Sequence, residues 1–236
     1  MTNALCLRAI AFVVLASMEC IAHSALFANA SFETVPGMAF GQGLLPSNWL
    51  DSTNTFPGAD TYSMDDTYGL TVGSFNHFNS PFAAYDGNRW LAGGAFPTGE
   101  REGISQLLPI TLVPGQQYEF KAAVTYTTLF GGTPPAAGGW ELMLSPDTTF
   151  TNAGAVSLGL LPATMLDVWQ LRSITFNAPP NANALPYLLL VPYTATPGQL
   201  AYSGIDGPLS IAVPEPAALF LALSALLFTG RSVRRR

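Results

Sequence analysis

The middle of the chain alternates short apolar runs with clusters of glycine, proline, asparagine and aspartate. No long segment shows the 3.6-residue apolar spacing of an amphipathic helix, whereas short alternating runs between turn residues are typical of antiparallel strands. Candidate strands cover residues 69–75, 90–95, 104–108, 117–125, 140–144, 171–177, 187–191, 202–206 and 209–213. The pattern predicts an all-β, antiparallel β-sandwich over residues 25–212.

The first 24 residues have the layout of a secretory signal peptide. Arg8 precedes an apolar stretch at residues 9–18, and small residues follow at 22–25. We expect cleavage after Ser24, because an apolar stretch of about ten residues is too short to span a bilayer, which takes about 20. The residues before Cys20 lack the small apolar run of bacterial lipidation sites, so lipidation is not expected.

The last 24 residues combine a proline motif, a short apolar segment and a basic tail. The motif is Val213, Pro214, Glu215 and Pro216, the apolar segment spans residues 217–229, and the tail contains Arg231, Arg234, Arg235 and Arg236. As a helix, 13 residues would cover about 20 Å of a hydrocarbon core about 30 Å thick. The segment therefore predicts a weak stop-transfer helix, with its arginines on the cytoplasmic side.

Residues 213–236 resemble the PEP-CTERM sorting signal of Gram-negative bacteria that make extracellular polysaccharide. The resemblance implies export through the Sec translocon, removal of the leader by signal peptidase, and a temporary hold in the inner membrane with a cytoplasmic C-terminus. It further implies cleavage near Pro214–Pro216 by an exosortase. The freed protein would then reach the cell surface or the exopolysaccharide matrix.

Charge and cysteine content exclude several classes of function. Residues 25–213 contain four basic and thirteen acidic side chains, a net charge of −9, which excludes binding to nucleic-acid phosphates. Both cysteines, Cys6 and Cys20, lie in the predicted signal peptide. The mature domain would thus have no disulfide, no thiolate metal site and no cysteine nucleophile.

Several segments of the middle domain, taken in order, resemble galactose-binding-like jelly rolls, the fold of many carbohydrate-binding modules. They are residues 29–33, Trp49, residues 104–107, residues 112–120, residues 169–176 and residues 205–211. The chain departs from the family pattern at Gly207 and Pro208. Because proline lacks the N–H of a strand ladder, Pro208 predicts an edge strand or a strand that begins after a bulge.

The resemblance also implies a structural calcium ion between the first and last strands, with Glu33 and Asp206 as its matching carboxylates. Calcium takes six to eight oxygen ligands, and the missing second acid at Gly207 weakens the assignment. The alternative is that Glu33 caps a turn and Asp206 is a solvated carboxylate at a strand end.

A sugar-binding surface would combine aromatic rings with amide and acid groups, because sugar C–H faces stack on rings while hydroxyls seek polar partners. Tyr85, Asp86, Asn88 and Trp90 offer these groups within six residues. The alternative places Trp90 in the core and residues 86–88 in a tight turn. Lesser aromatic candidates are Tyr62, Trp49 and Trp140.

No catalytic residue is assigned. His77 is the single histidine beyond the predicted signal peptide, which excludes a histidine-based zinc site, and no nucleophile-elbow motif is present. The working hypothesis is a non-enzymatic surface or matrix protein whose sandwich binds polysaccharide. The alternatives are a structural or adhesive matrix protein without a defined ligand, and a glycan-active hydrolase that uses paired carboxylates.

Overall fold

Two antiparallel sheets make up the computed structural model, which describes residues 24–35, 43–52, 58–63, 83–127 and 136–213. The first sheet has the order β3 (Asp60–Ser63), β4 (Arg89–Ala95), β11 (Ala201–Ala212), β6 (Gln117–Tyr126) and β9 (Gln170–Asn177), with β1 (Ser24–Leu26) paired to β11. The second has the order β2 (Leu50–Asp51), β5 (Ile104–Leu107), β10 (Tyr187–Thr194), β7 (Gly138–Ser145) and β8 (Val156–Ala163). A short 3-10 helix, η1, covers Ala182–Ala184.

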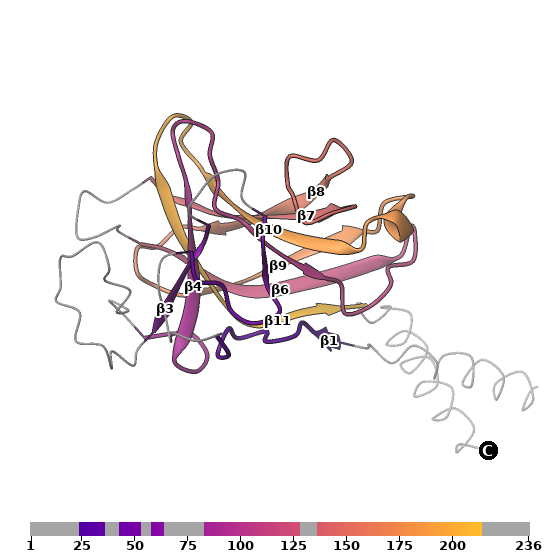
Figure 1. Cartoon of the computed structure of the whole chain (residues 1–236), viewed down its shortest axis with the longest axis horizontal. Coiled ribbons are helices and arrows are strands. Elements are labelled where there is room, and N and C mark those ends of the chain that lie inside the picture. The colour runs from indigo at the N-terminus through magenta and orange to yellow at the C-terminus, as the bar shows by residue number, and fades with distance from the viewer. Residues whose placement is uncertain (1–23, 36–42, 53–57, 64–82, 128–135, 214–236) are drawn as a thin grey trace, which may run out of the picture. The chain divides into compact units, whose positions relative to one another are not determined.

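The two sheets lie face to face (Figure 1), with apolar side chains packed between them. Leu91 and Ile205 are paired across β4 and β11 and are fully buried. A side chain added at Gly93, on the same face of β4, would lie 3.1 Å from the Trp140 ring of the second sheet. The opposite face of β4, which carries Trp90, Ala92 and Gly94, is therefore turned away from the second sheet.

The antiparallel β-sandwich predicted from the sequence is confirmed, and the predicted strands at residues 90–95, 104–108, 117–125, 140–144, 171–177 and 187–191 correspond to β4, β5, β6, β7, β9 and β10. β8 was not predicted, because Gly159 and Pro162 are strand-breaking residues. The predicted strand at residues 69–75 lies outside the described residues. Within the described part of the chain, no helix is long and apolar enough to cross a membrane.

The prediction that the last strand lies at an edge was wrong. Residues 201–212 form one continuous strand, β11, between β4 and β6. Its pairs with β4 end at Ile205, so Pro208 lies beyond them and its missing N–H breaks no bond to β4. The N–H of Leu209 then donates to the carbonyl of Ala30 at 3.2 Å, which continues the pairing on the N-terminal segment.

Candidate functional site

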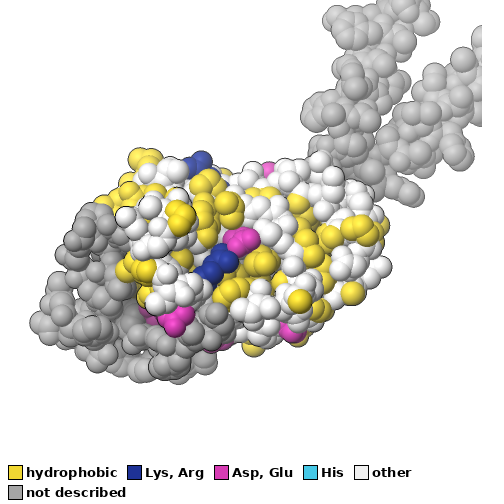
Figure 2. Space-filling model, turned by 90° about the horizontal axis from the view of Figure 1, so that it is seen from above, with side chains coloured by type: hydrophobic (Ala, Val, Ile, Leu, Met, Phe, Trp, Pro, Cys, Tyr) yellow, Lys and Arg dark blue, Asp and Glu magenta, His cyan; other side chains and the backbone are white. Residues whose placement is uncertain are grey.

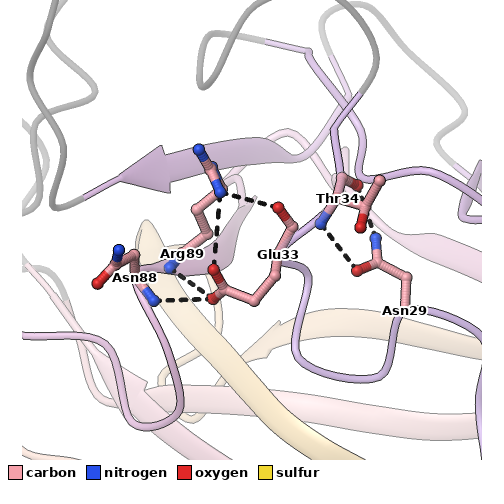
Figure 3. Close-up of polar contacts among 5 residues, drawn as sticks. All are labelled: Asn29, Glu33, Thr34, Asn88 and Arg89. Atoms are coloured by element: carbon pink, nitrogen blue, oxygen red, sulfur yellow. Dashed lines mark hydrogen bonds and ion pairs between the residues drawn. The ribbon is translucent and has the colours of Figure 1, made fainter.

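The turn that leads into β4, residues 85–89, is held at one end by Glu33. Its Oε1 accepts hydrogen bonds from the backbone N–H groups of Asn88, at 2.9 Å, and Arg89, at 2.8 Å (Figure 3). The Arg89 guanidinium donates to the Glu33 carbonyl at 2.8 Å and lies 3.6 Å from its carboxylate. Gly87, with φ +72°, is required here, because any side chain would overlap Glu33. These contacts fix the conformation of the turn.

Asp206 of β11 holds the other end of the same turn. Its Oδ2 accepts from the N–H groups of Tyr85, at 2.7 Å, and Asp86, at 3.0 Å, and its Oδ1 accepts from Gly207 at 2.7 Å. The side chain is fully buried. Burial raises the pKa of Asp206 to about 8, although the three N–H donors lower it. Asp206 is thus an interior link between β11 and the turn, and not a solvated strand-end group.

Glu33 and Asp206 meet on one turn, but their oxygens there accept N–H groups. A calcium ion requires six to eight oxygen ligands, and N–H donors directed at the carboxylates oppose it. Within the described residues, no group of three or more acidic, histidine or cysteine side chains could hold a metal ion. These hydrogen bonds give calcium no support, and calcium binding by Glu33 and Asp206 stays a prediction.

A row of aromatic rings runs from Trp90, on the face of β4 turned away from the second sheet, to the surface of the protein. Tyr62 stacks on Trp90 with ring centroids 4.4 Å apart, and the Trp90 and Trp169 rings meet edge to face with centroids 5.5 Å apart. Tyr85 lies against Trp169 at 6.5 Å and is 43% exposed. The Trp169 indole N–H donates to the Ala83 carbonyl at 2.7 Å, which fixes the ring beside the turn. Tyr85 and Trp169 form the surface end of the row.

The four predicted sugar-binding residues separate into a buried one and three at the surface. Trp90 is fully buried, as the core alternative predicted, whereas Tyr85, Asp86 and Asn88 are exposed on the turn. The lesser candidates Tyr62, Trp49 and Trp140 are all buried. Trp169 was missed as a partner of Tyr85, because only the fold brings these distant positions together.

Two further carboxyl groups are buried on the face of the first sheet that carries Trp90. The Tyr202 hydroxyl donates to Asp60 Oδ2, and Gly43 N–H donates to Oδ1 at 2.8 Å. Glu102 Oε2 accepts from Gly94 N–H at 2.7 Å. Burial raises the pKa of Asp60 to about 6 and that of Glu102 to about 8, with the charge of Asp60 as a second cause for Glu102. Asp60 follows Ala59 and Glu102 follows Arg101, and neither local sequence has the alternating apolar pattern that would signal such burial.

Most residues of the predicted sorting signals lie outside the described residues. Val213 follows β11 directly. The others are the predicted leader up to residue 23, Pro214, Glu215, Pro216, Arg231, Arg234, Arg235 and Arg236.

No protein-family model and no curated protein matches the chain. Among solved structures, a cyclase from Fischerella sp. TAU matches with a TM-score of 0.48 and 17% identity, covering 81% of this chain and 97% of that one. The CBM22-1 xylan-binding domain of Paenibacillus barcinonensis Xyn10C matches with a TM-score of 0.41 and 17% identity, covering 82% and 93%. A family 16 carbohydrate-binding module matches with a TM-score of 0.39 and 15% identity, covering 70% and 93%.

Proposed function

We propose that this chain is an exported, exosortase-processed protein of the cell surface or exopolysaccharide matrix of a Gram-negative bacterium, and that its β-sandwich binds polysaccharide without catalysis. The leader-like first 24 residues and the Pro-Glu-Pro motif, apolar segment and arginine tail of residues 213–236 support the route. The ordered motifs between them support a galactose-binding-like jelly roll.

The observation that carries the binding proposal is the Tyr85–Trp169 pair at the surface end of the aromatic row. An exposed ring beside a half-buried indole offers a platform for the C–H face of a sugar. The exposed Asp86 and Asn88 side chains on the same turn supply acceptors and donors for hydroxyl groups. Because Glu33 and Asp206 hold the turn, the platform is ordered before ligand binds, which lowers the entropic cost of binding.

Tyr85→Ala should weaken binding to neutral polysaccharide roughly 10-fold, since the loss of one stacking contact is worth about 1.4 kcal/mol. Affinity electrophoresis of the full chain in gels containing xylan, galactomannan or β-glucan, with and without calcium, measures the effect. Tyr187→Ala is the matched control, because Tyr187 lies on β10 in the other sheet. Equal retardation of Tyr85→Ala and the unmodified chain would count against the platform, and the release of new reducing ends would count against a purely binding role.

The sorting proposal predicts a shortened C-terminus. In cells that contain an exosortase, intact-mass measurement of the released protein should give an end near Pro214–Pro216. Glu215→Ala should slow release and leave the chain in the membrane fraction, with a surface-exposed lysine variant, Lys121→Gln, as control. A released protein that still ends at Arg236 would contradict this route.

A further inference from the structure

An open groove of about 280 Å³ lies between the β4–β5 and β10–β11 connections. The β4–β5 connection lines one wall of the groove with Phe96, Pro97 and Arg101. The end of β10 lines the other wall with Tyr193 and Thr194. None of these residues belongs to the Tyr85–Trp169 platform. Tyr85 precedes β4 and Phe96 follows it, so the two features lie at opposite ends of a strand that spans about 20 Å.

The Arg101 guanidinium in this groove is held rigidly. Its Nε donates to the Pro192 carbonyl at 2.6 Å, and its Nη2 donates to the Val191 carbonyl at 3.2 Å and to Glu141 Oε2 at 2.8 Å. The Phe150 ring lies 5.4 Å from its central carbon. Within the part of the chain that the structure describes, no hydrogen bond uses Nη1. A fixed guanidinium therefore retains two N–H donors for a ligand.

The charge around Arg101 favours an uncharged ligand. Glu141 pairs with the guanidinium at 2.8 Å, which removes most of its attraction for an anion and occupies part of the fork that would bind a carboxylate. Figure 2, viewed from above Figure 1, shows a face on which few charged side chains lie among hydrophobic and uncharged groups. Hydroxyl or ring oxygens suit the remaining N–H donors better than a second carboxylate does.

The groove also supplies aromatic surface. Phe96 folds over Gly94, with ring atoms 2.7 and 2.8 Å from the position of an added Cβ, and Tyr193 is half-buried at the opposite wall. The Tyr193 hydroxyl is a donor at neutral pH, and burial raises its pKa further. Aromatic rings next to a small number of fixed hydrogen-bond donors are typical of sugar-binding subsites.

We propose that this groove is a second saccharide subsite, which takes a neutral pyranose unit through Phe96, Tyr193 and the Nη1 group of Arg101. The proposal rests on the proposed polysaccharide binding and deepens it. With sites at both ends of β4, a long glycan could occupy the two together, and its affinity would exceed that of a short fragment through effective concentration.

The experiment titrates the full chain and its variants with a neutral polysaccharide that binds it, chosen from xylan, galactomannan and β-glucan, and with alginate as a uronate probe. Tyr193→Ala and Phe96→Ala should each weaken neutral binding roughly 10-fold, the effect of losing about 1.4 kcal/mol. Tyr187→Ala is the matched control, since it lies six residues earlier on the same face of β10 and outside the groove. Thermal melts of each variant establish that it is folded, and the two groove variants test the site independently.

The outcomes separate the two proposals. Normal binding by both groove variants, together with weak binding by Tyr85→Ala, would overturn the second subsite and leave the proposed function standing. Failure of the unmodified chain to bind any neutral polysaccharide would overturn the proposed function, and the subsite with it. Tighter binding of alginate that depends on Tyr193 would overturn the neutral-sugar assignment.

Discussion

Asp206→Ala should lower the free energy of unfolding by about 3 kcal/mol, because it leaves one buried and two part-buried N–H groups without their acceptor. Asp206 accepts from Tyr85, Asp86 and Gly207 from a fully buried position. An alanine side chain accepts no hydrogen bond, so all three N–H groups lose their acceptor in the folded chain. The turn that carries Tyr85 would also lose one of its two attachments, so polysaccharide affinity should fall together with stability.

Urea unfolding of the full chain at pH 7 measures this effect. Asp86→Ala is the matched control, because it removes an exposed carboxylate from the same turn and keeps the backbone N–H that Asp206 binds. We expect a change below about 0.5 kcal/mol for that surface variant. If Asp206→Ala were as stable as Asp86→Ala, Asp206 could not be the main attachment of the turn.

Stability should fall as pH rises from 5 to 9, the reverse of the behaviour of a protein held by ionised surface carboxylates. The pKa of Glu102 is raised from 4.5 to about 8, first by burial and then by the charge of Asp60, with smaller contributions from Asp51 and Glu100. Above pH 4.5 the unfolded chain releases this proton and the folded chain keeps it. The contribution of protonated Glu102 to the free energy of unfolding is therefore fully present below pH 4.5 and is lost as pH rises through about 8.

The loss attributable to Glu102 is at most about 5 kcal/mol, at about 1.4 kcal/mol for each unit of pKa. Asp60 and Asp206, whose pKa values burial raises to about 6 and about 8, act in the same direction. Unfolding in urea at a series of pH values measures the slope.

Glu102→Gln identifies the source of the slope. Glutamine keeps an oxygen for the Gly94 N–H and cannot ionise, so the slope between pH 5 and 8 should become shallower and retain only the contributions of Asp60 and Asp206. Glu119→Gln is the control, because Glu119 lies at the surface, 2.9 Å from Lys121. A chain that is more stable at pH 8 than at pH 5, or a Glu102→Gln variant that keeps the full slope, would contradict the assignment.

The sequence predicted much of the sandwich, because alternation of apolar residues is a local signal. It gave no indication of β3, which has only four residues, or of β8, which contains Gly159 and Pro162. Glu33 and Asp206 were singled out, and they do meet on one turn. Their hydrogen bonds to N–H groups depend on backbone geometry that residue types do not specify.

The sequence could predict neither the contact between Tyr85 and Trp169 nor the burial of Glu102. Both follow from the order of strands in the sheets, which places distant segments side by side. Local pattern identifies which residues form strands, whereas strand order decides which side chains become neighbours.

Arg101 has a consequence for contacts between copies of this chain. The pairs of β5 with β10 end at Leu190 and Ile104, and the guanidinium covers the next carbonyls, Val191 and Pro192. Uncovered carbonyls along a strand can recruit a strand from another molecule, which is a route to aggregation. A charged side chain anchored by Glu141 and Phe150 closes that position. At high protein concentration, it would keep neighbouring copies from joining strand to strand.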